Sequence, residues 1–199
     1  MQKTNYDIVM QNIIKNLTYK PSLLLHSCCA PCSSSVIEKL KDYFNLTVFY
    51  YNPNIYPEQE YIIRRDEQKN YLAKLGINFL EGDYNKSDYY NMINGFEGEP
   101  EGGSRCYKCY LLRMEKCAIM AKNMNFDYFC TTLSVSPHKN STYVNEIGEF
   151  LQNKYNIKFL FSDFKKRQGF LRSTELSKQN NFYRQNYCGC EFSLRKTDD

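Results

Sequence analysis

The sequence predicts an α/β fold, a parallel Rossmann-like sheet with helices on both faces. Its 199 residues suffice for one domain with a hydrophobic core of its own. Short apolar runs of strand length alternate with longer segments of helical periodicity, which is typical of parallel sheets covered by crossover helices. Polar and cysteine-rich stretches follow several of the expected strands. A ligand site is therefore expected beyond the carboxyl ends of the strands.

The first half of the chain carries clear element signals. Residues 1–20 have helical apolar spacing and predict a helical extension outside the main fold, which leaves 21–199 as a single α/β catalytic domain. An apolar run over 22–27 predicts a buried strand. A helix is expected over 33–44, with serines at its start supplying the N-cap. A long helix begins at residue 58 and is expected to end at Gly76.

The other elements follow the same alternation. Further helices are expected over 86–96, 109–124 and 142–155, and further strands over 46–51, 77–82, 126–133 and 157–164. The loops after four strands, at 26–32, 52–57, 131–139 and 162–167, should converge on one crevice because parallel strands end at the same edge.

Composition excludes some classes of protein. No apolar stretch approaches the roughly 18 residues of a membrane span, and the N-terminus lacks the apolar core of a signal peptide, so a cytoplasmic protein is expected. In a reducing compartment, nine cysteines indicate metal binding or redox chemistry rather than structural disulfides. The net charge of +4 permits a polyanionic partner without requiring one.

Seven of the nine cysteines fall in three tight groups within polar segments. The other two, Cys117 and Cys130, lie in apolar patterns and are expected to be small buried hydrophobes. The three groups are Cys28, Cys29 and Cys32, then Cys106 and Cys109, then Cys188 and Cys190.

The spacing of these groups favours an iron–sulfur cluster over structural zinc. More than seventy residues separate the two C-x-x-C pairs, whereas structural zinc sites usually hold their pairs about 15–20 residues apart. An all-thiolate site also suits a cluster, which typically takes four cysteines. The remaining cysteines would then form a second metal site or a redox pair. Gly189 would let Cys188 and Cys190 approach each other.

Five sequence blocks, in order between His26 and Cys190, resemble the epoxyqueuosine reductases of the QueH type, the cobalamin-independent form. The blocks are HSCCAPCSS, YYNPNIYPEQEYIIRR, RCYKCYLLRM, TTLSVSPHKN and KKRQGFLRSTELSKQNNFYRQNYCGC. The resemblance implies a fold related to adenine-nucleotide α-hydrolases. Where PP-loop relatives carry a phosphate loop after the first strand, this chain has CCAPC.

The resemblance also implies the activity, that of an oxidoreductase in the last step of queuosine formation. An epoxide on the modified base at the tRNA wobble position is reduced to an alkene with two electrons and two protons, and oxygen leaves as water. Cys188 and Cys190 would be a redox-active pair or, with Cys32, would hold an additional iron acting as a Lewis acid. The implied [4Fe-4S] ligands are Cys28, Cys29, Cys106 and Cys109.

Further candidates are assigned around this centre. A proton donor to the opening epoxide is expected among Tyr107, Tyr187 and His138. The substrate pocket is expected to include Glu60, Tyr61 and Arg64, although Glu60 and Arg64 have the i,i+4 spacing of a surface salt bridge. The basic stretch predicted to contact tRNA phosphates comprises Lys165, Lys166, Arg167 and Arg172, and Phe170 or Tyr183 would stack on an unpaired anticodon base.

Two readings from other classes remain open at this point. One is a zinc-stabilised RNA-binding module, and the other is a thiol–disulfide oxidoreductase that uses its C-x-x-C pairs. The electron donor is not identified, because the sequence carries no flavin or NAD fingerprint.

Overall fold

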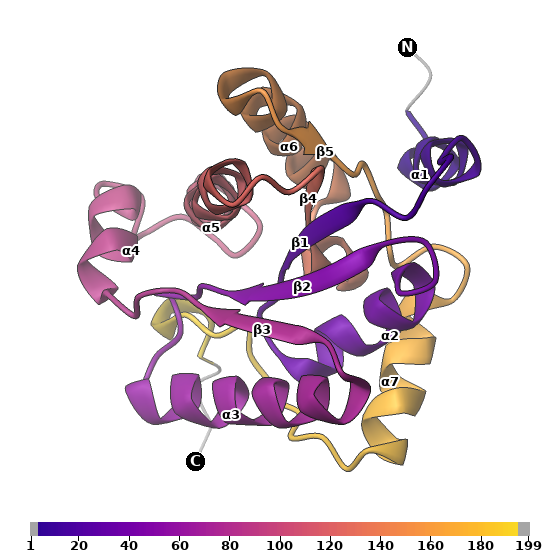
Figure 1. Ribbon diagram of the computed structural model, residues 1–199. Coiled ribbons are helices and arrows are strands. Elements are labelled where there is room, and N and C mark those ends of the chain that lie inside the picture. The colour runs from indigo at the N-terminus through magenta and orange to yellow at the C-terminus, as the bar shows by residue number, and fades with distance from the viewer. Residues whose placement is uncertain (1–3, 195–199) are drawn as a thin grey trace.

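The computed structural model describes residues 4–194 and contains one five-stranded sheet (Figure 1). The strand order is β3-β2-β1-β4-β5, and every pair of neighbours runs parallel. The strands are β1 Ser22–His26, β2 Asn45–Tyr50, β3 Asn78–Glu81, β4 Tyr128–Thr131 and β5 Lys158–Phe159. Strands β2 and β3 follow one another on one side of β1, and β4 and β5 follow one another on its other side. The order of the strands therefore reverses between β1 and β4, which is the topological switch point of the sheet. The predicted parallel α/β fold is confirmed.

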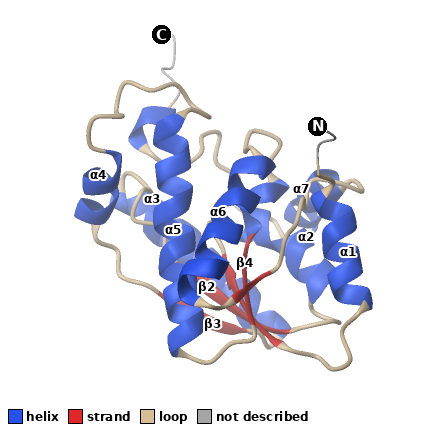
Figure 2. Cartoon of the chain, turned by 90° about the horizontal axis from the view of Figure 1, so that it is seen from above, coloured by secondary structure: helices blue, strands red, loops and turns tan. Residues whose placement is uncertain are grey.

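Helices cover both faces of this sheet. Helices α4, α5 and α6 lie on one side, and α2, α3 and α7 lie on the other (Figure 1); α5 and α6 lie in front of the strands in Figure 2. The helices are α1 Tyr6–Lys15, α2 Ala30–Leu40, α3 Glu58–Leu75, α4 Lys86–Ile93, α5 Ser104–Asn123, α6 Ser141–Tyr155 and α7 Gly169–Gln179. Short 3₁₀ turns cover Thr132–Val135 and Glu191–Ser193. No helix within residues 4–194 is long and apolar enough to cross a lipid bilayer.

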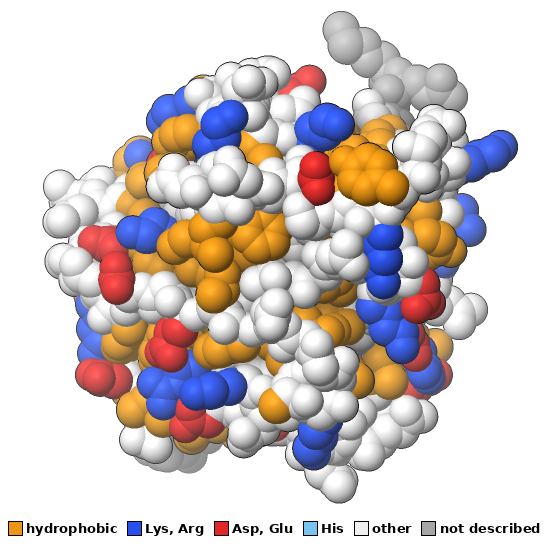
Figure 3. All heavy atoms as spheres, viewed as in Figure 1, with side chains coloured by type: hydrophobic (Ala, Val, Ile, Leu, Met, Phe, Trp, Pro, Cys, Tyr) orange, Lys and Arg blue, Asp and Glu red, His pale blue; other side chains and the backbone are white. Residues whose placement is uncertain are grey.

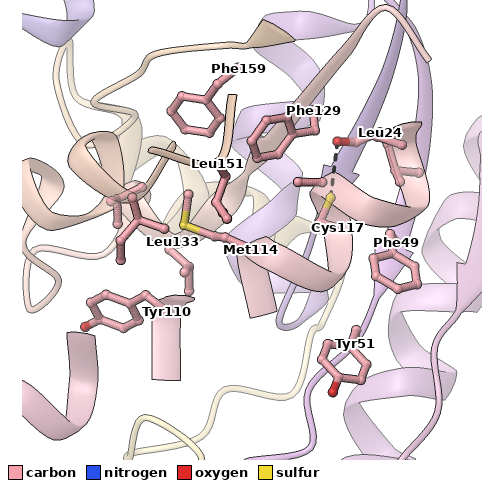
Figure 4. Close-up of a cluster of buried hydrophobic side chains, with 14 of the residues drawn as sticks. Leu24, Phe49, Tyr51, Tyr110, Met114, Cys117, Phe129, Leu133, Leu151 and Phe159 are labelled. Carbon is pink, nitrogen blue, oxygen red and sulfur yellow. Dashed lines mark hydrogen bonds between the residues drawn. The ribbon is translucent and has the colours of Figure 1, made fainter. Parts of the chain in front are cut away.

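Alternating side chains of the central strand explain why both faces are apolar. Leu24 points into the core under α5 and α6, whereas Leu23 and Leu25 pack against α2 on the opposite face. Figure 4 shows the first of these cores, in which the Cys117 thiol donates to the Leu24 carbonyl at 3.7 Å. Cys117 and Cys130 are fully buried, as expected for structural cysteines.

The helix near the N-terminus is part of the packed core. Asn5 caps α1 by accepting from the backbone N–H groups of Asp7 and Ile8. Met10 is fully buried in the core cluster that contains Leu23 and α2. Helix α1 therefore packs against the main fold through Met10. The assignment of residues 1–20 as a helical extension, divided from 21–199, stays a prediction.

Several boundaries differ from the sequence expectation. Helix α2 begins at Ala30, so Ser33, Ser34 and Ser35 lie inside it and do not supply the N-cap; Pro31, with its fixed φ, sits in the first turn instead. Helix α5 begins at Ser104, five residues earlier than expected. Strand β5 has only two residues, and α7 was not anticipated. Helix α3 ends as predicted, with Gly76 at φ 65°.

Candidate metal centre

The turn between β1 and α2 brings three thiols together at the switch point of the sheet. Cys29 is the N-cap residue of α2 and makes no side-chain capping hydrogen bond, so its thiol is free to face its neighbours. The Sγ atoms of Cys28, Cys29 and Cys32 all lie within 4.8 Å of one another. The Sγ atoms of Cys28 and Cys29 are 3.9 Å apart. This spacing suits thiolates that share a metal or a cluster.

A buried polar network fixes both ends of this turn. Gln68, fully buried on α3, accepts hydrogen bonds from Ser27 Oγ at 2.7 Å and from Ser33 Oγ at 2.9 Å. Asn52 Nδ2 donates to the Ser27 carbonyl at 2.9 Å. The turn that carries the cysteines is therefore held at both ends by three hydrogen bonds, which involve Gln68 and Asn52.

The three thiols differ in acidity. Hydrogen bonds from Cys29 and Cys32 hold the pKa of Cys28 well below its usual range. The hydrogen bond to Cys28 raises the pKa of Cys29 to about 12. The pKa of Cys32 is raised as well, chiefly by its hydrogen bonds with Cys28 and Cys29. A bound cation would favour the thiolate form of all three residues, because it compensates their negative charge.

The second group of thiols comes from α5 and the C-terminal segment. Cys106 and Cys109 are one helical turn apart and both are buried. The Gly102 backbone N–H donates to Cys106 Sγ at 3.2 Å. Cys109 packs with Cys190 in a small apolar cluster, and burial raises the pKa of Cys109 to about 12. Within residues 4–194, only the first group meets the close spacing of a preformed site.

Gly189 shapes the C-terminal part of the centre. Its φ of 128° disfavours any side chain, and an added Cβ would lie 3.0 Å from Arg64 Nη1. Its carbonyl accepts from the Tyr56 N–H at 2.8 Å, while Arg64 Nη1 donates to the Cys188 carbonyl at 3.4 Å. These contacts fasten Cys188 and Cys190 to the sheet edge, in agreement with the expected bend at this glycine.

A cavity of about 370 Å³ opens beside both groups. Cys28 and Cys32 line it from one side and Cys188 from another, together with His138 and Lys139 from the loop after β4. Two of the four loops expected at the crevice reach this cavity. The other walls come from α7, from residues 184–188 of the C-terminal segment, and from Glu101 and Ser193; they include Phe170, Arg184 and Tyr187.

Some of the residues predicted to bind substrate or donate a proton line the cavity, and others do not. Glu60 and Arg64 form a buried ion pair of 2.6 Å, so the surface reading of this pair is wrong. Tyr61 is buried against Tyr84 and donates to Glu81, away from the cavity. Tyr107 packs edge-on to Tyr143 on the outer side of α5 and does not line the cavity. Among the three proposed proton donors, the cavity lining includes His138 and Tyr187.

The other histidine has a structural role. His26 Nε2 lies 3.2 Å from the Tyr51 carbonyl, which can only accept, so Nε2 carries the proton and Nδ1 accepts from the Thr131 hydroxyl at 2.8 Å. Burial, together with the Arg113 charge, lowers the pKa of His26 to about 3. This neutral imidazole, hydrogen-bonded through both ring nitrogens, links β1 to Thr131 of β4 and to Tyr51, the residue after β2.

The basic stretch is largely engaged in ion pairs. Lys165 pairs with Asp163, and Arg167 pairs with Asp7, both at 2.7 Å. Arg172 bridges Glu38 at 2.7 Å and Glu175 at 3.0 Å, whereas Lys166 is exposed. On the face shown in Figure 3, basic and acidic side chains are likewise interspersed. These pairs reduce the charge that the stretch offers to phosphate groups.

Two important residues gave no recognisable sequence signal. Gln68 and Arg113 sit within helices that carry many polar residues, where a polar side chain is expected to face solvent. Both are buried, and their hydrogen-bond partners are Ser27, Ser33 and the Cys109 carbonyl, which adjoin or belong to the cysteine groups. Both residues have other polar residues three or four positions away in the sequence, as surface residues of a helix also do, so the sequence pattern does not mark them as buried. Only the packing of α3 and α5 against the sheet reveals them.

Comparison with known proteins agrees with this architecture. The chain resembles a predicted subunit of tRNA methyltransferase from Methanocaldococcus jannaschii, with a TM-score of 0.51 and 14% identity over 77% of this chain and 75% of that one. It also resembles the U34-tRNA thiolase NcsA from Methanococcus maripaludis, solved with its [4Fe-4S] cluster. That match has a TM-score of 0.53 and 11% identity over 94% of this chain and 68% of that one. These matches support the parallel α/β fold.

Sequence similarity is much closer to one group. The family model described as epoxyqueuosine reductase QueH matches residues 23–196. Epoxyqueuosine reductase QueH of Streptococcus pyogenes serotype M1 is 42% identical, with 98% of this chain and 80% of the relative covered. The protein of that name from Thermotoga maritima is 35% identical, with 87% of this chain and 90% of the relative covered. The chain therefore belongs to the QueH family of epoxyqueuosine reductases.

Proposed function

We propose that this protein reduces epoxyqueuosine to queuosine at the wobble position of tRNA, and that the cysteine groups hold a [4Fe-4S] cluster. The observation that carries the proposal is the close group of Cys28, Cys29 and Cys32 at the switch point, beside a cavity that Cys188 of the C-terminal segment also lines. Cys109 of α5 packs with Cys190 of the same C-terminal segment. Membership of a reductase family favours this function over the non-catalytic zinc module and the thiol–disulfide oxidoreductase.

The residues present fit an anionic, thiolate-ligated group. The donor set consists of thiols, which suit iron–sulfur clusters. Two buried arginines, Arg64 and Arg113, each have an Nη2 atom without a hydrogen-bond partner within the described chain. Buried guanidinium N–H groups are costly to leave unpaired, and a negatively charged cluster would compensate them. The proposed cluster ligands remain Cys28, Cys29, Cys106 and Cys109.

The cluster, when bound, would supply the single-electron transfers that side chains perform poorly. The remaining thiols, Cys32, Cys188 and Cys190, border this centre and are proposed to form a redox pair or to hold an additional iron. Cys32 and Cys188 line the cavity, so they face the space that a substrate would occupy. His138 and Tyr187 share that space and are the candidates for delivering a proton to the epoxide oxygen.

The cavity suits an extruded base better than a duplex. Its 370 Å³ lies within the range of small-molecule sites, and Phe170 and Tyr187 offer aromatic faces for stacking. Lys139 and Arg184 add positive charge at its wall. We propose that these two residues, together with the exposed Lys166, contact tRNA phosphates, since the rest of the basic stretch is ion-paired.

The decisive experiment measures metal content and turnover on the same sample. Protein purified without oxygen should contain about four acid-labile sulfides with four or five irons per chain, and five irons would indicate the additional iron. It should convert epoxyqueuosine in tRNA when supplied with a chemical reductant such as dithionite. Zinc without sulfide, even after reconstitution, would contradict the proposal.

A matched pair of cysteine variants sharpens this test. Cys109→Ala should lose the cluster and the activity, because it removes a proposed ligand. Cys130→Ala should keep both, because Cys130 is buried in the core on the other side of the sheet. Equal iron and sulfide content in the two variants would show that Cys109 is not a ligand.

A further inference from the structure

Arg113 is a buried cation without an anionic partner in the described part of the chain. Its side chain is on α5, one turn after Cys109, and the residue is 2% exposed. Its Nε donates to the Cys109 carbonyl at 3.1 Å, and its Nη1 reaches Asn52 Oδ1 only at 3.5 Å. None of the ion pairs among residues 4–194 includes Arg113.

The contrast with Arg64 makes this arrangement informative. Arg64 is equally buried, but Glu60 lies 2.6 Å from its Nε and neutralises its charge. Both arginines have an Nη2 atom without a partner in the described residues, but Arg113 has neutral hydrogen-bond partners only. A guanidinium cannot lose its proton in a protein, so the charge remains and an unpaired burial is strongly unfavourable. Its compensation is therefore expected from an anion that belongs to the site.

The surroundings of Arg113 identify that anion. Arg113 Nε donates to the carbonyl of Cys109, which belongs to the second thiol group. Its Nη1 contacts Asn52, which donates to the carbonyl of Ser27, the residue before Cys28 of the first group. The guanidinium therefore lies between the two thiol groups. Asn52, which also fastens the β1–α2 turn, holds it from below.

We propose that Arg113 is a positioning residue that acts through the cysteine-ligated centre. Its fixed charge compensates the net negative charge of the thiolate-bound metal, joins the two cysteine groups, and makes the centre easier to reduce. Reduction adds one electron to an already negative group, so a nearby cation stabilises the reduced form more than the oxidised form. The inference rests on the proposed function for the identity of the centre.

The test compares reduction of the centre in three variants. Arg113→Met removes the charge while filling similar space, Arg113→Lys keeps the charge, and Lys116→Met removes one charge from a half-buried position on the same helix. At the wild-type midpoint potential, Arg113→Met should lower the ratio of reduced to oxidised cluster at least tenfold, a 59 mV shift for one electron. Arg113→Lys and Lys116→Met should each stay within about threefold.

Thermal unfolding of the metal-free protein separates charge from packing. If Arg113 serves the centre, metal-free Arg113→Met should unfold no lower than the metal-free wild type, because a buried unpaired charge has been removed. A reduction ratio unchanged in Arg113→Met would overturn the proposal. If Arg113→Met does not fold, Arg113→Lys serves as the test. A tenfold shift of the reduction ratio in Arg113→Lys, which keeps the charge, would also overturn the proposal, because the charge would then not be the property that matters.

Failure of the proposed function would be recognised separately. If the wild type binds zinc without sulfide, the reductase assignment fails, but zinc held by four thiolates is also negatively charged. Arg113→Met should then weaken zinc binding at least tenfold relative to Lys116→Met, measured by chelator competition. Equal zinc affinities in the two variants would refute the role of Arg113.

Discussion

The buried pair of Glu60 and Arg64 offers a quantitative test of how the C-terminal cysteines are held. The carboxylate and guanidinium are 2.6 Å apart, with side chains 8% and 1% exposed. Their attraction is roughly 6 kcal/mol at an effective dielectric constant of about 20, before desolvation is subtracted. An exposed pair with the same i,i+4 spacing would contribute only about 0.5 kcal/mol.

Removing one partner should be far more costly than removing both. Arg64→Met leaves the Glu60 carboxylate buried with only the Tyr183 hydroxyl as a hydrogen-bond donor, and it should destabilise the protein by about 3–5 kcal/mol. Glu60→Leu leaves the guanidinium unpaired and should cost a similar amount. The double variant replaces the pair by apolar groups and should lose much less than the sum of the two single changes.

The measurement is a double-mutant cycle on metal-free protein, with unfolding followed in urea. A coupling free energy of at least about 3–5 kcal/mol is expected, because the double variant should cost less than either single change. Arg64→Met should also retain less iron, since Arg64 donates to the Cys188 carbonyl. Additive single-variant effects, within about 0.5 kcal/mol, would refute the reasoning and show that the charges are solvated.

Two further predictions concern the scaffold. Gly148→Ala would place a Cβ against the packed Phe159 ring and should destabilise the protein by about 1–3 kcal/mol in urea unfolding. Gly98→Ala, where an added Cβ has nothing within 4 Å, should change the stability by no more than about 0.5 kcal/mol, and similar losses in the two variants would contradict this reasoning. Asp127 accepts from the Ser22 hydroxyl at 2.7 Å, and this bond lowers the carboxyl pKa. Its stabilisation should be present above the unfolded-state pKa of about 3.9 and disappear as pH falls through the lower folded value, so Asp127→Asn should lower the melting temperature at pH 7 but not near pH 2.

The fold class could be predicted from the sequence, and so could the cysteine groups of the candidate centre. Apolar runs of strand length with intervening helical periodicity required a parallel sheet, because only crossover helices can cover both faces of such strands. The C-x-x-C pairs and the cysteines around Gly189 could be recognised as a site, since their clustering in polar segments is independent of folding. The end of α3 at Gly76 was also local information, because a left-handed C-cap favours glycine.

Helix starts were less certain from local signals. Pro31 and the following serines fit either a loop or a first turn, and only the packed structure places Cys29 at the N-cap of α2. The start of α5 at Ser104 likewise makes Cys106 and Cys109 helical neighbours, a geometry that the residue spacing alone left open.

Tertiary structure alone decided which charged residues are buried and what they face. Glu60 and Arg64 look like a surface pair in the sequence, and Arg113 looks like a solvent-exposed helix residue, yet all three are buried near the cysteines. Conversely, Arg172 of the basic stretch is occupied by Glu38, which lies 134 residues away in the chain. Burial and long-range charge pairing depend on how distant segments pack, and no local sequence pattern contains that information.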